Sequence, residues 1–331
     1  MKPFKYTIAK DVATATKQVT GNPNARFLAG GTNLLDLMKE DVEQPDEVVD
    51  VTRLGLTQIK ATAAGGISIG GLGRNSDAAN HPLVRQHYPV LTQAILAGAS
   101  GQIRNMATNG GNLLQRTRCP YFYDVSMPCN KREPGSGCGA LEGINRMHAI
   151  FGWSEKCIAV YPSDMAVAMA VLDAVVRIKD ANGQERSVGI LDFHRLPGDT
   201  PEKDTNLGHG ELISSIEIPK NNFADHSYYL KVRDRASYAF ALVSVAAALE
   251  IKENVISDVR IAMGGVAHKP WRASKAEQML IGKEATEANF KQAANAEMAD
   301  AKPFEHNKFK VELGNRSIVR ALQMALNGSK S

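Results

Sequence analysis

The strongest constraint on the fold is a strand-to-helix junction near the N-terminus, where residues 29–39 read AGGTNLLDLMK. Residues 26–29 predict a buried strand, and the residues after the two glycines predict a helix with the apolar face Leu34, Leu35, Leu37 and Met38. Glycine lets a backbone approach a ligand closely, and free N–H groups at a helix N-terminus bind phosphate oxygens. The segment is neither G-x-G-x-x-G nor G-x-x-x-x-G-K-[ST], which excludes a Rossmann fingerprint and a Walker loop. A plain tight turn capped by threonine or asparagine explains the same residues equally well.

A second glycine turn is predicted at residues 107–112, which read ATNGGN. Thr108, Gly110, Gly111 and Asn112 offer another set of backbone and side-chain donors to a phosphate. A doubled glycine alone is more often a structural turn. Two such turns in one domain nevertheless suit a ligand with two phosphates, such as a dinucleotide.

The rest of the chain predicts short helices and strands distributed over two or three domains, because 331 residues exceed the usual single core. The charged run of Lys231, Arg233, Asp234 and Arg235 is typical of a solvated face, and Asp164 is most simply a helix cap. A domain boundary is expected at residues 219–227, where polarity peaks. The predicted helices are 11–19, 89–99 and an amphipathic helix at 163–174; the predicted strands are 47–50, one within 65–79, 174–179 and 212–218, with a hairpin turn after 179.

Composition is that of an ordinary soluble globular protein, with 44% hydrophobic and 22% charged residues. The formal net charge is only +4 and the basic residues are scattered, so nucleic-acid binding has little support. The sequence contains no apolar run of about 18 residues, so no membrane span is predicted. The N-terminal residues lack the apolar region and cleavage site of an export signal.

All four cysteines fall in the pattern Cys119-x9-Cys129-x8-Cys138-x18-Cys157, and the first three lie in a Pro- and Gly-rich irregular segment. Structural zinc sites usually use closely spaced C-x2–4-C pairs, which are absent here. Wide spacing favours a bulkier iron–sulfur cluster, with zinc, disulfides or unrelated thiols as the alternatives. Five basic residues of the same segment could balance the cluster's negative charge: Arg116, Arg118, Lys131, Arg132 and Arg146. The histidines form no H-x-x-H pair and no G-x-S-x-G motif occurs, so a mononuclear metal site or a serine nucleophile is not indicated.

Several of these segments resemble the FAD-binding medium subunits of the xanthine dehydrogenase and carbon monoxide dehydrogenase family. The matching stretches are FLAGGTNLLDLMK, QIRNMATNGGN, YPSDMA, GGVAHKPWR and RALQMAL, which span nearly the whole chain. The resemblance implies an α+β fold in which an FAD-binding PCMH-type domain (1–222), made of two α/β subdomains (about 1–55 and 56–222), precedes a smaller CO-dehydrogenase-flavoprotein-like α+β domain (223–331). It implies FAD contacts from Arg26, Phe27, Leu28, Ala29, Gly30, Gly31, Thr32, Asn33, Leu34, Thr108, Gly111 and Asn112, with further contacts from Asp164, Ile213 and Lys231.

The link between the second glycine segment and the P-x-S-D helix is usually short in the family, but here it is an insertion at residues 113–161. The insertion resembles the branch that carries an extra [4Fe–4S] cluster, including the flavin subunits of periplasmic aldehyde oxidoreductases. That resemblance implies cluster ligation by Cys119, Cys129, Cys138 and Cys157. It also implies export together with a signal-bearing partner to the periplasm, whereas the sequence alone favours the cytoplasm.

The resemblance implies a heterotrimer in which a large molybdopterin subunit oxidises an aldehyde and a small subunit with two [2Fe–2S] clusters relays the electrons. This chain would pass them through FAD to an external acceptor. Xanthine dehydrogenases cover the flavin with an aromatic residue where NAD docks, but residues 97–100 read AGAS, which favours another acceptor. Two alternatives are a self-sufficient FAD-dependent oxidoreductase that binds its substrate near residues 233–238, and a zinc-stabilised binding or assembly protein.

Overall fold

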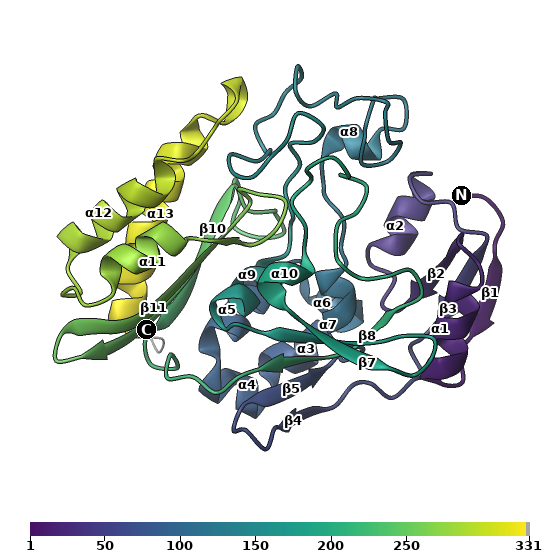
Figure 1. Cartoon of the computed structure of the whole chain (residues 1–331), viewed down its shortest axis with the longest axis horizontal. Helices are drawn as coiled ribbons and strands as arrows, with labels where there is room; N and C mark the ends of the chain where they lie inside the picture. Colours follow the sequence, from purple (N-terminus) through teal and green to yellow (C-terminus); the bar gives the residue numbers. More distant parts are fainter. Residues whose placement is uncertain (329–331) are drawn as a thin grey trace.

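The strands of the chain form three separate sheets, each with its own helices (Figure 1). A computed structural model describes residues 1–328. The first sheet has three parallel strands in the order β1-β3-β2. Its elements are β1 (Lys5–Ile8), α1 (Val12–Thr20), β2 (Ala25–Leu28), α2 (Leu34–Lys39) and β3 (Glu47–Asp50). The predicted helix at 11–19 and the strands at 26–29 and 47–50 are therefore confirmed to within a residue or two.

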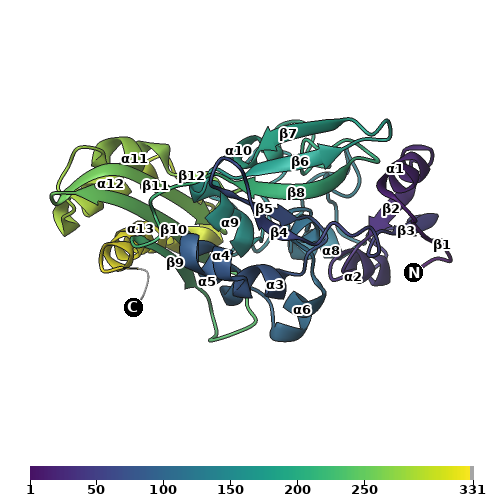
Figure 2. The ribbon, with the colours of Figure 1, turned by 90° about the horizontal axis from the view of Figure 1, so that it is seen from below.

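The second sheet is antiparallel, with the order β4-β5-β8-β6-β7. Helices lie along one side of it in Figure 2, and the predicted hairpin joins β6 to β7. Its strands are β4 (Ile59–Ala61), β5 (Ile67–Gly70), β6 (Val175–Lys179), β7 (Glu185–Gly189) and β8 (Leu212–Ile218). The helices of this part are α3 (Asn75–Asn80), α4 (Pro82–His87), α5 (Pro89–Ala97), α6 (Gly101–Met106), α7 (Asn109–Leu113), α9 (Asp164–Val171) and α10 (Ile190–Phe193).

Helix α9 corrects one prediction, because it is not amphipathic. Every residue from Met165 to Val171 is buried, since α9 lies between α5 on one side and strands β10 and β11 on the other. The hydroxyl of Ser163 accepts a hydrogen bond from the Ala166 N–H at 3.0 Å, so Ser163 is the N-cap and Asp164 is the first helical residue. The Asp164 carboxylate is thereby free for a contact outside the helix.

The third sheet is antiparallel, with the order β12-β11-β10-β9. Helices α11 to α13 cover one face of it, as Figures 1 and 2 show, while α5 and α9 lie against the other. Its elements are β9 (Ser227–Val232), β10 (Val243–Lys252), β11 (Val255–Gly264), β12 (Trp271–Arg272), α11 (Ser274–Leu280), α12 (Glu287–Met298), the 3-10 turn η1 (Glu305–Asn307) and α13 (Phe309–Leu326).

The insertion at residues 113–161 is irregular, as predicted, and α8 (Pro120–Tyr123) is the one helix inside it. Its loops lie between α2 and the C-terminal domain at the top of Figure 1. On one side Phe122 packs against Leu37 of α2, and on the other the Ile150 N–H donates to the Val266 carbonyl at 2.9 Å. Among the described helices, none is long and apolar enough to cross a membrane.

Candidate functional site

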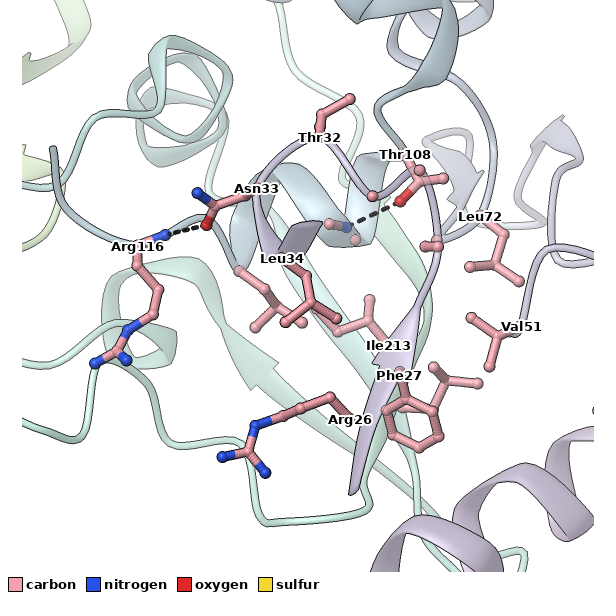
Figure 3. A pocket seen from close by; sticks show the side chains of 18 of the residues that line it. Arg26, Phe27, Thr32, Asn33, Leu34, Val51, Leu72, Thr108, Arg116 and Ile213 are labelled. Carbon is pink, nitrogen blue, oxygen red and sulfur yellow. Dashed lines mark hydrogen bonds between the residues drawn. The ribbon is translucent and has the colours of Figure 1, made fainter. Parts of the chain in front are cut away.

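The two glycine segments, residues 29–33 and 107–112, both line one cavity of about 290 Å³ (Figure 3). The second segment was predicted as a turn, but residues 109–113 form the short helix α7. Thr108 is its N-cap, and its hydroxyl accepts a hydrogen bond from the Gly111 N–H at 3.2 Å. The short helix forms because the threonine cap satisfies an N–H group at its start, which outweighs the low helix propensity of two glycines.

Close backbone contact explains the first glycine pair. A Cβ atom on Gly30 would lie 2.1 Å from the Met106 carbonyl oxygen, so only glycine lets the two segments touch. Gly31 has a φ of +72°, a left-handed conformation that favours glycine. Packing of the cavity wall therefore requires Gly30, whereas backbone conformation favours glycine at position 31.

Most of the predicted FAD contacts line this first cavity. Leu28 does not, whereas its neighbours Arg26 and Phe27 in β2 both do. The predicted residues that line it are Arg26, Phe27, Ala29, Gly30, Gly31, Thr32, Asn33, Leu34, Thr108, Gly111 and Ile213. Gly110, named above as a phosphate donor of the second glycine turn, also lines it. The prediction missed Leu37, Glu43, Val51, Gly71, Leu72, Leu114, Arg116, Glu211 and Leu212. None of these nine residues has a local sequence signal for a phosphate-binding turn.

Asn33 lies where the two segments meet. Its side-chain oxygen accepts a hydrogen bond from the Arg116 backbone N–H at 2.9 Å, drawn as a dashed line in Figure 3. The side-chain nitrogen is buried and has no hydrogen-bond partner within the described residues. A buried donor without a partner is costly, so this amide is available to a bound ligand.

A second cavity of about 650 Å³ continues from the first, and the two share Thr32, Asn33 and Gly111. The second cavity is also lined by the remaining predicted residues Asn112, Asp164 and Lys231. The glycine segments therefore stand at the junction of two arms. This shape suits an elongated ligand whose diphosphate sits at the junction.

Asp164 and Lys231 form a buried ion pair in the wall of the second cavity. The Lys231 Nζ lies 2.7 Å from the Asp164 Oδ2, and their side chains are only 5% and 10% exposed. The Tyr229 hydroxyl donates to the other carboxylate oxygen at 2.5 Å. Burial, followed by the charge of Asp164, raises the pKa of Tyr229 well above its ordinary value. The interpretation of the charged run as a solvated face is thus wrong for Lys231.

All four cysteines line one small cavity inside the insertion. Cys129 and Cys138 face each other through an antiparallel backbone bridge. Burial raises the pKa of the Cys119 thiol to about 12. A hydrogen bond from the Cys157 thiol lowers the pKa of Cys138 to about 6, against the effect of burial. The structure therefore brings together side chains that lie up to 38 positions apart, counted from 119 to 157.

Within the described residues, the cysteine cavity contains no preassembled metal-binding group. Within residues 1–328, no three His, Cys, Asp or Glu side chains are arranged to hold one metal ion. Two histidines lie beside the cysteines: His148 Nε2 is 3.1 Å from the Cys119 Sγ, and His268 Nε2 is 3.8 Å from the Cys157 Sγ. Burial lowers the pKa of His148 to about 4, so that ring is neutral at pH 7.

The basic residues of the insertion have partners of their own. Arg132 donates to several backbone carbonyls, including that of Phe122 at 2.8 Å. The other four pair with carboxylates: Arg116 with Glu43 and Asp204, Arg118 with Asp36, Lys131 with Asp204, and Arg146 with Asp234. These contacts hold the insertion in place, whatever charge the cysteines carry.

Comparison with known proteins agrees with the shape of the cavities. Residues 2–221 match the family described as "FAD binding domain in molybdopterin dehydrogenase", and residues 228–325 match "CO dehydrogenase flavoprotein C-terminal domain". The chain belongs to this family. It is an FAD-binding subunit of the xanthine dehydrogenase and carbon monoxide dehydrogenase type, and its α+β fold and FAD cofactor were predicted correctly.

The flavoprotein is 51% identical to the aldehyde oxidoreductase FAD-binding subunit PaoB of Escherichia coli, over 98% of this chain and 99% of that protein. It is 31% identical to the glyceraldehyde dehydrogenase medium chain of Sulfolobus acidocaldarius, over 91% of this chain and 89% of that one. Among solved structures, quinoline 2-oxidoreductase from Pseudomonas putida aligns with a TM-score of 0.75 at 25% identity over 99% of both chains. Carbon monoxide dehydrogenase from Hydrogenophaga pseudoflava shares the fold with a TM-score of 0.77, at 24% identity over 99% of both chains.

The residues present fit FAD. The unpartnered Asn33 amide lies at the junction of the two cavities and offers a donor to a diphosphate there. The two arms provide space for the two halves of a dinucleotide on either side of that point.

Proposed function

We propose that this flavoprotein is the electron-transfer subunit of a heteromeric, molybdenum-dependent aldehyde oxidoreductase. A large subunit with the molybdopterin cofactor would oxidise the aldehyde, and a small subunit with two [2Fe–2S] clusters would deliver the electrons to this chain. The observation that carries the proposal is the two-armed cavity, together with the 51% identity to an aldehyde oxidoreductase subunit.

Bound FAD supplies the redox chemistry, since a flavin can take up electrons singly and pass them on in pairs. The protein's part is to hold and orient it. Thr108, Gly111 and Asn112 would close around the diphosphate from one side and residues 29–34 from the other. The Lys231–Asp164 pair would present a fixed, buried dipole to the second arm.

The second cofactor we propose is a [4Fe–4S] cluster held by Cys119, Cys129, Cys138 and Cys157. A single zinc, the alternative, would hold its thiolates about 2.3 Å away. Within residues 1–328 no three such side chains are arranged to hold a metal ion, so ligand geometry does not separate zinc from a cluster. The proposal rests on the gathering of four cysteines around one small cavity and on the resemblance of the insertion to the cluster-bearing branch of the family. A third cavity of about 210 Å³ runs from Cys119 to Asp164 in the wall of the flavin cavity, which supports a role near the flavin.

We further propose that the electron acceptor is not NAD and that the complex acts in the periplasm. Gly98 and Ala99 line the second cavity, so residues 97–100 do not supply the aromatic residue that covers the flavin in xanthine dehydrogenases; the aromatic residues in this cavity wall are Tyr238 and Phe240. The periplasmic location is carried over from the resemblance of the insertion to the flavin subunits of periplasmic aldehyde oxidoreductases, and the cytoplasm is the alternative. Cell fractionation of the assembled complex decides between the two compartments.

The deciding experiment is to measure the absorption spectrum, iron and sulfide of the anaerobically purified chain. Flavin bands with about four irons and four sulfides per chain are expected for FAD and one cluster. Cys129→Ser should lose the iron and keep most of the flavin, whereas Val125→Ser, an exposed change in the same insertion, should keep both. Full iron content in Cys129→Ser, or a zinc-bearing and colourless wild-type chain, contradicts the cluster.

Electron transfer itself is tested with the assembled complex. Aldehyde should bleach the flavin only when the large and small subunits are both present, and reoxidation by NAD should be slow compared with reoxidation by a quinone or an artificial acceptor. Bleaching of the isolated chain by aldehyde would favour the self-sufficient oxidoreductase instead.

A further inference from the structure

The flavin cavity and the cysteine insertion are joined by a continuous chain of charged side chains. Arg116 donates through Nη1 to the Glu43 carboxylate at 2.7 Å and through Nε to the Asp204 carboxylate at 2.8 Å. Asp204 also accepts from the Lys131 Nζ at 2.5 Å. Arg26 extends the chain, with its Nη2 3.5 Å from the second Glu43 oxygen. Arg26, Glu43 and Arg116 line the flavin cavity, whereas Lys131 lines the cysteine cavity.

Asp204 is the member on which the others depend. The Lys131 side chain is 1% exposed, and its remaining partner is the Pro201 carbonyl oxygen at 2.6 Å, so Asp204 is its single carboxylate. Burial alone would raise the pKa of Asp204, but the charges of Lys131 and Arg116 lower it to about 2. A buried ammonium that loses its carboxylate is strongly destabilised, so the insertion is fixed where Asp204 holds it.

Helix α2 makes a second, independent contact between the same two regions. Its Leu37 packs against Phe122 and Cys129 of the insertion in a small apolar cluster. On its neighbouring residue, the Asp36 carboxylate accepts from Arg118 at 3.0 Å and from the Tyr123 hydroxyl at 2.9 Å. Helix α2 starts at Leu34, directly after the loop of residues 29–33 that lines the flavin cavity. Displacement of the insertion would therefore remove the contacts that hold the helix at the end of this loop.

We infer that Asp204 is a positioning residue that couples FAD binding to the order of the cysteine insertion. It lines neither flavin cavity and acts through Arg116 on one side and Lys131 on the other. Coupling of this kind is reciprocal: whatever FAD gains from an ordered insertion, the insertion gains from bound FAD. The inference needs FAD and the protein alone, and does not depend on a metal in the cysteine cavity.

The first test compares Asp204→Asn with Asp199→Asn, a matched change in the same loop. Asp199 pairs with Lys156 at 3.0 Å and its side chain is 91% exposed, so its loss leaves the buried chain of charges intact. FAD release from the full chain on dilution is followed by the recovery of free-flavin fluorescence. Asp204→Asn should weaken FAD binding about tenfold, within the range of roughly 5- to 150-fold typical of coupled sites. Asp199→Asn should leave it unchanged, and equal affinity in the two variants would overturn the inference.

The second test is hydrogen exchange of the amides in residues 127–138, with FAD bound and after its removal. In the wild-type chain FAD should slow exchange in this segment, although the segment does not line the flavin cavities. In Asp204→Asn this effect of FAD should disappear. Persistence of the wild-type difference in the variant would show that the coupling runs by another route and would refute the role of Asp204.

Lys131→Met covers the case in which Asp204→Asn fails to fold. Because Lys131 does not line the flavin cavities, weaker FAD binding in this variant cannot come from a lost contact. Native FAD affinity in a folded Lys131→Met chain would contradict the inference. Iron analysis of the same samples tests the proposed cluster separately. If the chain contains no iron, the cluster proposal fails, but the comparison of FAD affinities still tests the role of Asp204.

Discussion

The glycine segments and the cysteine insertion border one another, but they are stabilised by different forces. The glycine segments are held by close backbone contact, as where Gly30 meets the Met106 carbonyl, and by the local Thr108 cap. The insertion has almost no regular structure and is held by buried charged side chains. Lys131 binds Asp204, Arg132 binds carbonyls of its own loop, and Lys310 of α13 donates to the His148 and Gly265 carbonyls at 3.0 and 2.7 Å.

The comparison teaches that the two regions should respond to different perturbations. Backbone contact depends on shape and is insensitive to pH and salt, so the glycine segments should fail when a methyl group is added. Buried charges depend on protonation and on their partners, so the insertion should respond to pH and to the loss of a single charge. The following changes test that division, from the largest expected effect to the smallest.

Gly30→Ala should have the largest effect, because the added Cβ would meet a backbone oxygen that cannot move without separating the two glycine segments. We expect a loss of about 3 kcal/mol in the free energy of unfolding, at the upper end for overpacking, and loss of bound FAD. Thermal unfolding and flavin content measure this. Gly101→Ala is the control, since no atom lies within 4 Å of its added Cβ. Equal stability of the two variants would show that the glycine contact is not limiting.

Lys310 provides the test by pH. Burial lowers its pKa to about 7, whereas an unfolded lysine titrates near ~10.4. Between these values the unfolded chain binds more protons, so the folded state gains stability as the pH rises, by up to about 1.4 kcal/mol per pH unit. Raising the pH from about 7.5 to about 9.5 should therefore stabilise the wild-type chain by roughly 2 kcal/mol relative to Lys310→Met.

Lys308→Met serves as the control for this measurement, because Lys308 is exposed on the same part of the chain. Chemical unfolding at the two pH values gives the slopes. If Lys310→Met and the wild-type chain show the same pH dependence, burial does not lower the pKa of Lys310 as the structure indicates.

Gly31→Ala should have a smaller effect than its neighbour. Its Cβ would meet the end of the flexible Leu35 side chain, at 2.9 Å from Cδ1, and the main cost is the left-handed φ of +72°. We expect about 1 kcal/mol in the free energy of unfolding and a modest weakening of FAD binding, measured as for Gly30→Ala. A loss larger than that of Gly30→Ala would reverse the order of importance of the two glycines.

Arg146→Ala should have the smallest effect, although Arg146 also lies in the insertion. Both of its nitrogens are 2.9 Å from the Asp234 carboxylate, but the two side chains are 44% and 57% exposed. An exposed pair contributes less than about 1 kcal/mol and is screened by salt. Thermal unfolding at low and high salt measures this. A loss of about 2 kcal/mol in the free energy of unfolding, as large as the pH effect expected for Lys310, would contradict the distinction between buried and exposed charges.

Much of the fold was predictable because its signals are local. The strand at 212–218, the hairpin after 179 and the helix at 11–19 follow from alternation, turn residues and caps within a few positions. Helix α9 was placed correctly but misjudged as amphipathic, since whether a second apolar face is covered depends on β10 and β11, which lie far along the chain. Leu28 does not line the cavity although Arg26 and Phe27 of the same strand do, so the lining could not be read from strand alternation alone.

The sequence by itself determined the glycine segments, the family and the position of the insertion, because glycine, caps and cysteine spacing carry their physical reason in neighbouring residues. It did not predict that Arg116 binds both Glu43 and Asp204. These three charged residues lie far apart in the sequence, and no local pattern marks them as partners. Only the tertiary structure decided that Lys231 is buried against Asp164 and that Asp204 is shared by two cations. The reason is electrostatic: the energy of a buried charge depends on the partner that the fold brings to it, and that partner can lie anywhere in the chain.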